Sequence, residues 1–212
     1  MIKIGVLNYG AGNLINVKRA IEFLGYRYIL VSSSEHFSKI DGLIIPGVGA
    51  FPKAMENLKQ ANLINDIKTF ANTRKPILGI CLGMQLLFET GYEFKKTKGL
   101  GLIKGEVRSF PSKNNLGNDN KVPHIGWSKV IKNSSIQEQK IIKQIKDTNY
   151  FYFLHSFIAV PENKENILTL TDYNSNLFPS IVCSDNIIGC QFHPEKSGKS
   201  GLALLKSFLE ID

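Results

Sequence analysis

The chain has 212 residues, a length that suits one large domain with a continuous hydrophobic core. Hydrophobic residues make up 43% and no apolar run is long enough to span a bilayer, which excludes an ordinary membrane-spanning protein. The formal charge of +8 is best explained by a lysine-rich solvated surface, because the densest cluster, at 95–98, has no aromatic residue interleaved with it. We therefore predict binding to neither nucleic acid nor membrane.

The three cysteines, Cys81, Cys183 and Cys190, form no CxxC pair. A disulfide framework or a metal site is therefore not expected. The first residues, MIKIGVL, read as a short strand and not as a secretory signal, because the apolar part is too short. These features predict a cytoplasmic protein without a metal.

The first ninety residues predict alternating strands and helices. Short apolar runs predict strands at 2–7, 28–31, 42–45 and 77–80. Apolar residues at helical spacing, bounded by Gly and Pro, predict helices over 13–24, 51–58, 63–71 and 82–88. This alternation is typical of an α/β fold, in which a mostly parallel sheet is flanked by helices.

The second half changes character. Short strand-like runs, separated by Asn, Gly, Ser and Pro, predict strands at 107–110, 127–131, 151–154, 167–171, 180–183 and 187–192. We expect many of these to be antiparallel strands added to the open α/β sheet. A polar loop is predicted over 111–121 and an amphipathic helix over 199–209, all within a single domain spanning 1–212.

The first candidate for chemistry is Cys81, which stands between Gly79 and Gly83 directly after a predicted strand. This is the form of a nucleophile elbow, a sharp strand-to-helix turn whose glycines let strand and helix approach closely. The start of the following helix would stabilise a negative sulfur, and the backbone N–H of Leu82 would face a developing oxyanion. A cysteine is also often a small buried hydrophobic residue, so the motif alone leaves both interpretations open.

The second candidate is the segment His193-Pro194-Glu195, which follows the predicted strand at 187–192. Pro194 disfavours helix at His193, and in an extended segment residues two apart point to the same side. Glu195 could therefore orient the imidazole and leave its other nitrogen for a thiol. His124 and His155 have no carboxylate two residues away, and we interpret them as structural or adjacent to substrate.

The third candidate is PGVGAF, at 46–51, after the predicted strand at 42–45. Two glycines could form only a turn, or they could cradle a phosphate, although the Lys-Ser/Thr of a P-loop does not follow. They could also supply an oxyanion donor from the peptide between Val48 and Gly49, since glycine lets that peptide take either orientation.

Together, GICLGMQ at 79–85 and HPE at 193–195 resemble the class I, or triad, glutamine amidotransferases. With PGVGAF at 46–51, PHIGW at 123–127, FLHSF at 153–157 and HPEKSG at 193–198, the chain is more specifically similar to the amidotransferase subunits that serve imidazole glycerol phosphate synthase in histidine biosynthesis. The similarity runs from residue 8 to the last helix and implies a flavodoxin-like sheet. Asn8 and Ser128 depart from this pattern, in which an acid and an asparagine are usual.

The resemblance implies a reaction. Cys81 attacks the side-chain amide of glutamine, ammonia leaves, and a γ-glutamyl thioester is hydrolysed to glutamate. His193 moves the proton and Glu195 orients the ring. The expected pocket residues are Gln85, Ser156 and Phe157, and the expected oxyanion donors come from Val48, Gly49 and Leu82.

The resemblance also implies a partner. A (β/α)8-barrel synthase subunit would form a heterodimer with this chain, receive the ammonia through an internal channel, and make imidazole glycerol phosphate and aminoimidazole carboxamide ribotide. Asn13, Trp127 and Lys196 are expected at that interface, and no cofactor is expected.

Three alternatives remain on the residues alone. A paralogous glutaminase could feed a different acceptor, such as an amidino sugar of a surface polysaccharide, and the departures at Asn8 and Ser128 motivate keeping it. A non-catalytic binding homologue would not need an intact triad. A cysteine hydrolase of the same fold would need neither Gln85 nor a partner.

Overall fold

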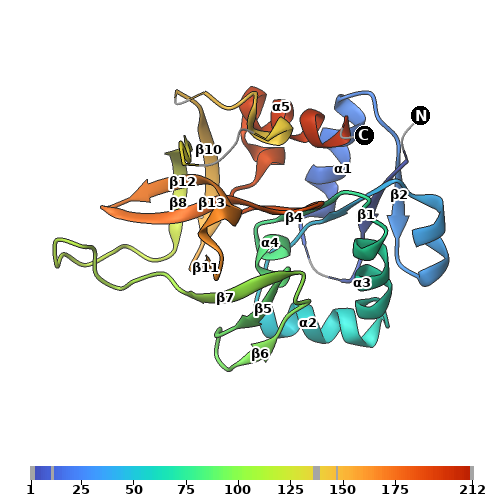
Figure 1. Ribbon diagram of the computed structural model, residues 1–212, viewed down its shortest axis with the longest axis horizontal. Coiled ribbons are helices and arrows are strands. Elements are labelled where there is room, and N and C mark those ends of the chain that lie inside the picture. The colour runs from blue at the N-terminus through green and yellow to red at the C-terminus, as the bar shows by residue number, and fades with distance from the viewer. Residues whose placement is uncertain (1–2, 11, 136–138, 147, 211–212) are drawn as a thin grey trace.

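The computed structural model describes residues 3–10, 12–135, 139–146 and 148–210. An eight-stranded sheet with the order β2-β1-β3-β4-β14-β13-β12-β9 runs through the molecule (Figure 1). Its strands are β1 (Ile4–Leu7), β2 (Tyr28–Val31), β3 (Gly42–Ile45), β4 (Ile77–Ile80), β9 (Ile131–Lys132), β12 (Ile167–Tyr173), β13 (Asn176–Ser184) and β14 (Ile187–Cys190). The five strands from β2 to β14 are parallel and the last three pairings are antiparallel, which confirms the predicted α/β class.

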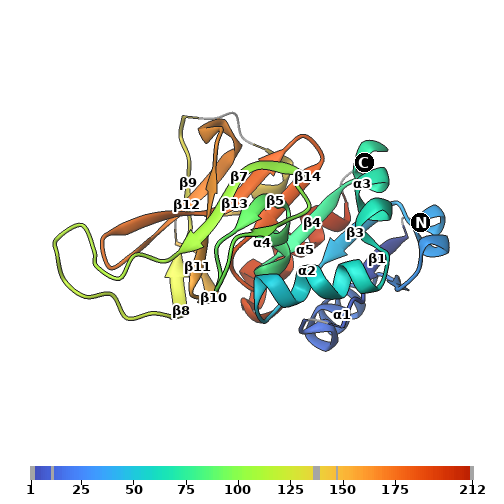
Figure 2. The ribbon, with the colours of Figure 1, turned by 90° about the horizontal axis from the view of Figure 1, so that it is seen from below.

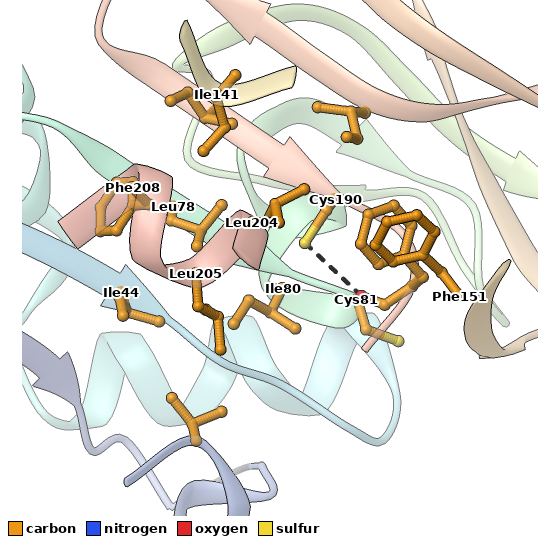
Figure 3. Close-up of a cluster of buried hydrophobic side chains, with 14 of the residues drawn as sticks. Ile44, Leu78, Ile80, Cys81, Ile141, Phe151, Cys190, Leu204, Leu205 and Phe208 are labelled. Carbon is orange, nitrogen blue, oxygen red and sulfur yellow. Dashed lines mark hydrogen bonds between the residues drawn. The ribbon is translucent and has the colours of Figure 1, made fainter. Parts of the chain in front are cut away.

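Helices cover both faces of this sheet, because its parallel strands carry apolar residues on both sides. The helices α1 (Leu14–Phe23) and α5 (Gly198–Leu209) lie on one face, and α2 (Phe51–Gln60), α3 (Ile64–Asn72) and the short α4 (Leu82–Leu86) lie on the other (Figures 1 and 2). Within β3, Ile44 packs toward α5 whereas its neighbours Leu43 and Ile45 pack toward α2 and α3. Figure 3 shows Ile44, with Leu78 and Ile80 of β4, against the apolar side of α5. The buried apolar clusters on the two faces of the sheet hold the strand ends in place.

Two smaller sheets lie beside the large sheet, and each contacts its antiparallel half at β12 or β13. One pairs β8 (His124–Lys129) with β10 (Tyr150–His155), and the other has the order β11-β7-β5-β6, from β5 (Phe88–Gly91), β6 (Thr97–Lys98), β7 (Ile103–Ser109) and β11 (Phe157–Pro161). Short 3₁₀ helices complete the chain: η1 (Ser34–Lys39), η2 (Lys140–Ile142), η3 (Lys164–Asn166) and η4 (Pro194–Lys196).

The structure differs from expectation mainly around these small sheets. The helix predicted over 82–88 ends at Leu86, because the backbone N–H groups of residues 100–103 donate to the carbonyls of Leu86, Leu87 and Phe88. Periodicity cannot distinguish strand from helix in so short an apolar run. The strand predicted at 127–131 is divided between β8 and β9, β11 was not predicted, and Ile2 of the first predicted strand lies outside the described residues.

No helix among the described residues is long and apolar enough to cross a membrane.

Candidate active site

The candidate residues meet where neighbouring parallel strands end. Strand β4 leads into Cys81 and its neighbour β14 leads into Gln191 and His193, with Ile80 and Cys190 paired across the last register position. The Cys81 N–H donates to the Cys190 carbonyl at 2.8 Å, which fixes the two strand ends together. Ligand sites of open α/β sheets lie at this carboxyl edge.

The turn at Cys81 has the geometry of a nucleophile elbow. Cys81 has φ +53° and ψ −110°, a strained conformation for a residue with a side chain. The glycines around it are required by space: a Cβ on Gly83 would collide with the Ile45 carbonyl oxygen, and a Cβ on Gly79 would lie 2.6 Å from the Gly83 carbonyl oxygen. The predicted elbow is therefore present, and its strain holds the sulfur at the strand end.

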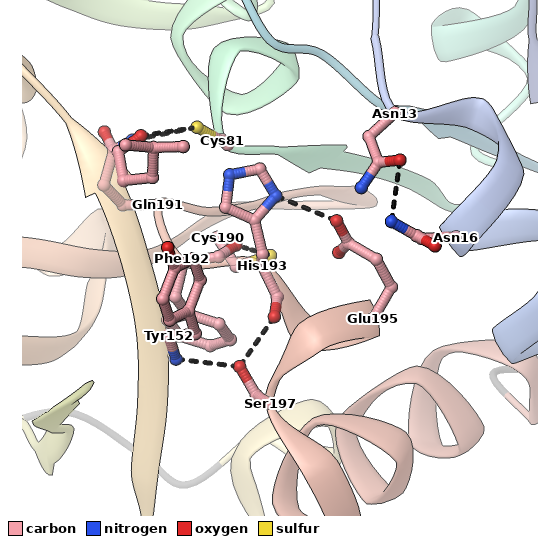
Figure 4. Close-up of polar contacts among 11 residues, drawn as sticks. Asn13, Asn16, Cys81, Tyr152, Cys190, Gln191, Phe192, His193, Glu195 and Ser197 are labelled. Carbon is pink, nitrogen blue, oxygen red and sulfur yellow. Dashed lines mark hydrogen bonds and ion pairs between the residues drawn. The ribbon is translucent and has the colours of Figure 1, made fainter. Parts of the chain in front are cut away.

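His193 and Glu195 form a buried pair. His193 Nδ1 lies 2.8 Å from Glu195 Oε1, and each side chain is only 1% exposed (Figure 4). His193 itself is extended, as predicted, but Glu195 reaches it through the 3₁₀ turn η4 and not by strand alternation. Ser197 supports the turn by donating to the His193 carbonyl at 2.6 Å and accepting from the Tyr152 N–H at 2.9 Å.

The other ring nitrogen of His193 faces the sulfur. Nε2 is buried without a hydrogen-bond partner among the described residues, and Figure 4 shows this edge of the ring turned toward Cys81. Burial lowers the pKa of His193, but a negative Cys81 sulfur and the Glu195 carboxylate act more strongly in the opposite direction, so that the pKa is raised to about 10. The ring is therefore a proton donor at neutral pH, which is what a leaving amine needs.

Gln191 is a neighbour of the nucleophile that the sequence did not single out. Its Nε2 lies 3.8 Å from Cys81 Sγ, and the same sulfur lies 3.5 Å from the Leu154 carbonyl oxygen. Gln191 is fully buried, and its side-chain oxygen accepts from Gln85 Nε2 at 3.2 Å. Its place at the end of β14, two residues before His193, is the signal that could have identified it.

The expected oxyanion donors are near the sulfur, but they do not form a finished site. The Leu82 N–H donates to the Gly47 carbonyl oxygen at 3.3 Å, so it is occupied. Gly49 has φ +113°, a conformation that favours glycine, and this agrees with the expectation that the Val48–Gly49 peptide depends on glycine. The buried Tyr9 hydroxyl donates to the Pro46 carbonyl at 2.8 Å and fixes the start of this loop.

A cavity of about 220 Å³ opens above Cys81. Among its lining residues are the predicted Val48, Gly49, Leu82, Gln85, Ser156 and Phe157. Gln85 Nε2 donates to the Phe157 carbonyl oxygen at 3.1 Å, so this amide supports the cavity wall. The volume suits a small metabolite.

Glu93 also lines this cavity and was not predicted. Its Oε2 accepts from the Phe51 N–H at 2.6 Å, which places its carboxylate at the start of α2. No motif marks Glu93 in the sequence, because it lies in an irregular segment between β5 and β6.

Two of the three residues expected at an interface lie on one exposed surface. Trp127 is 54% exposed, and its ring centroid lies 6.1 Å from that of Tyr152. The ammonium of the exposed Lys196 lies 5.7 Å from the centroid of the same Tyr152 ring. Asn13 stands at the start of α1, which packs against η4; Figure 4 shows it near Glu195, and it accepts from Asn16 Nδ2 at 2.8 Å.

No group of three His, Cys, Asp or Glu side chains within the described ranges could hold a metal ion. The contacts described above bring the Cys81 sulfur, the His193 ring and the Glu195 carboxylate together, an arrangement that can serve a nucleophile, a proton carrier and an orienting carboxylate.

Comparisons with known proteins agree with this geometry. The family model for class-I glutamine amidotransferases matches residues 5–211. An imidazole glycerol phosphate synthase subunit HisH 1 from Legionella pneumophila strain Lens is 43% identical over 213 residues, with full coverage of both chains. A subunit HisH from Lactococcus lactis is 45% identical over 210 residues, covering 99% of each chain.

Solved structures share the fold at lower identity. The structure of PurLQS from Thermotoga maritima superposes with a TM-score of 0.75 at 20% identity, over 99% of this chain and 98% of that chain. A structure described as a glutamine amidotransferase gives a TM-score of 0.73 at 18% identity, over 98% and 97%. With the family model spanning nearly the whole sequence and full-length relatives above 40% identity, this chain belongs to the class I glutamine amidotransferase family, in its HisH branch.

Proposed function

We propose that this chain is the glutaminase subunit of imidazole glycerol phosphate synthase, and that it hydrolyses glutamine at Cys81 and passes the ammonia to a (β/α)8-barrel subunit. The observation that carries the proposal is the buried His193–Glu195 pair whose free nitrogen faces Cys81 beneath a small cavity. We further propose that residues 1–212 form one glutaminase domain.

The proposed reaction begins at Cys81. The thiolate sulfur attacks the side-chain carbonyl carbon of glutamine, and the electron pair of the C=O bond moves to oxygen. Protonated His193 then gives its Nε2 proton to the amide nitrogen, the C–N bond breaks, and ammonia leaves. Glu195 stabilises the imidazolium and fixes its orientation through Nδ1.

Water completes the cycle. Neutral His193 takes a proton from a water molecule, which attacks the γ-glutamyl thioester. The C–S bond breaks, glutamate leaves, and Cys81 and His193 return to their starting protonation. Each tetrahedral oxyanion requires N–H donors, so the Gly47 carbonyl must leave the Leu82 N–H before turnover.

Glutamine recognition is supported by the charges at the cavity. Glu93 is the acidic side chain lining it, and we propose that its carboxylate receives the α-ammonium group of glutamine. The segment Leu154–Phe157 also lines the cavity, and Gln85 holds this segment through the Phe157 carbonyl.

The exposed surface of Trp127, Tyr152 and Lys196 is proposed to meet the barrel, together with Asn13. Relatives named as HisH subunits at 40–45% identity support the histidine-pathway acceptor. The paralogue feeding a sugar acceptor is not favoured.

The test is reconstitution with a purified (β/α)8 synthase subunit and its phosphoribosyl-formimino aminoimidazole carboxamide substrate. Glutamine should drive formation of imidazole glycerol phosphate and aminoimidazole carboxamide ribotide in equal amounts. Trp127→Ala should weaken the complex at least tenfold, whereas Leu30→Ala, exposed on the opposite sheet edge at β2, should not. A complex that hydrolyses glutamine but aminates only a different acceptor would overturn the assignment.

A further inference from the structure

Two histidines outside the triad, His124 and His155, form a buried pair, and His155 itself lines the cavity. His124 Nδ1 lies 3.1 Å from His155 Nε2. The outer nitrogen of each ring also has a partner: His124 Nε2 lies 2.9 Å from the Ser128 hydroxyl, and His155 Nδ1 lies 2.9 Å from the Phe157 carbonyl oxygen. All four ring nitrogens are therefore engaged in one continuous chain of contacts.

When both rings are neutral, this series of hydrogen bonds can run in only one direction from donor to acceptor. A carbonyl oxygen can only accept, so His155 must carry its proton on Nδ1. Its Nε2 is then an acceptor, and His124 must donate from Nδ1. His124 Nε2 is in turn an acceptor, so the Ser128 hydroxyl must donate to it. The Phe157 carbonyl thus determines the tautomer of two rings and the orientation of a hydroxyl group.

The surroundings favour neutral rings. Burial lowers the pKa of His124 to about 4. Burial, followed by the neighbouring His124, lowers the pKa of His155 to about 3, although its bond to the Phe157 carbonyl acts in the opposite direction. His124 is stacked between Phe153, at 4.9 Å, and Tyr173, at 4.0 Å, so its ring plane is fixed.

One end of this hydrogen-bond chain is the Phe157 carbonyl oxygen, which belongs to a residue lining the cavity. The Phe157 carbonyl that accepts from His155 also accepts from Gln85 Nε2. Gln85 donates to Gln191 at 3.2 Å, and Gln191 lies 3.8 Å from Cys81 Sγ. The other end of the hydrogen-bond chain is Ser128, which is half-buried on β8 beside the exposed Trp127.

We propose that Ser128, His124 and His155 are positioning residues for the glutaminase: they form a one-way hydrogen-bond chain that holds the Leu154–Phe157 wall, and through Gln85 the floor around Cys81, in the shape that binds glutamine. The substrate in this statement rests on the proposed function; the direction of the chain does not.

The proposal makes a specific demand at position 128, which must donate a hydrogen bond. Asn and Asp have nearly the same shape, but only the Asn amide can donate. In Ser128→Asp the carboxylate would draw a proton to His124 Nε2. A neutral His124 would then present a lone pair to the lone pair of His155 Nε2, and the link between the rings would be lost.

The first measurement is the ¹⁵N spectrum of the histidine rings in the full chain, which has only four histidines. His124 and His155 should both be neutral with the proton on Nδ1 at pH 7, and they should remain so in Ser128→Asn. In Ser128→Asp, His124 should become an Nε2–H tautomer or an imidazolium. An Nε2–H tautomer or a charged ring at either position in the unsubstituted chain would overturn the proposal.

The second measurement is the KM for glutamine in the complex with the barrel subunit and its acceptor nucleotide. Ser128→Asn should stay within twofold, and Ser128→Asp should raise KM at least fivefold with a smaller change in kcat. Ser184→Ala, a half-buried serine of β13 with no part in this chain, should have no effect and serves as the control. Equal KM values for the Asn and Asp variants would overturn the positioning role.

Should the Asp variant fail to fold, Ser128→Ala replaces it, because alanine removes the donor without adding a charge. This variant should also raise KM, and an unchanged KM would contradict the proposal.

If the unsubstituted complex released no glutamate, the proposed function would fail, while the ring tautomers would still decide whether the one-way hydrogen-bond chain exists.

Discussion

The backbone N–H of Leu82 donates to the carbonyl oxygen of Gly47, 3.3 Å away. This contact puts a carbonyl oxygen where a glutaminase needs a free donor for the developing oxyanion. Because Gly49 lets the Val48–Gly49 peptide take either orientation, rotation of that peptide would remove the other expected donor. The Gly47 carbonyl is a further obstacle one residue earlier in the same loop. Cys81, His193 and Glu195 are brought together, but the Leu82 N–H proposed as an oxyanion donor is not free.

The isolated chain should therefore be nearly inactive on glutamine. Loss of one oxyanion donor typically costs about 2.7–4 kcal/mol, or roughly a hundred- to thousand-fold in rate. The barrel subunit loaded with its nucleotide should raise glutamate release at least a hundredfold by moving the Gly47–Gly49 segment. The measurement is steady-state glutamate release by the chain alone, with partner, and with partner plus nucleotide. Full activity of the chain alone would rule out this gating while leaving the triad intact.

Glu195→Gln should change both the rate and its pH dependence. Glu195 helps to raise the pKa of His193 to about 10, so removing its charge lowers that pKa. The imidazolium is the proton donor, and it would then be lost at a lower pH. The alkaline limb of the glutaminase profile should move to lower pH, with a smaller loss of rate than in His193→Ala. A profile that coincides with wild type would exclude the carboxylate from the reaction.

Gly83→Ala should destabilise the fold itself. A Cβ at this position would collide with the backbone of Ile45, which cannot move without displacing β3. Overpacking of a core typically costs about 1–3 kcal/mol, and occasionally more. Gly42→Ala is the control, because its Cβ would meet the flexible end of Ile4 at 3.1 Å and should cost less. Urea unfolding measures both, and an equal loss of stability would show that the elbow has room.

Much of the parallel half was predictable, because buried parallel strands carry uninterrupted apolar runs between Gly and Pro. Strands β2, β3 and β4 begin and end at the predicted residues. The end of α4 was not predictable, since the donors to the carbonyls of Leu86–Phe88 come from residues 100–103. Long-range pairing of this kind leaves no local signal.

The active site likewise contains some residues that the local sequence predicts and others that it does not. Cys81, His193 and Glu195 follow strands and stand in motifs, so the local sequence is enough to propose them as candidates. Gln191 and Glu93 were missed, because their contacts depend on which strand ends meet. The pairing of His124 with His155 was missed for the same reason: 31 positions separate them in the chain, and β8 and β10 bring them together.

In the proposed mechanism, Cys81 alone releases ammonia from glutamine for use by the partner. The most direct measurement compares product formation by the reconstituted complex with glutamine and with ammonium salts. Cys81→Ala should lose glutamine-dependent synthesis and glutamate release but keep synthesis from ammonium, while Cys183→Ala and Cys190→Ala should keep both activities. Continued glutamate release by the Cys81→Ala complex would contradict the account.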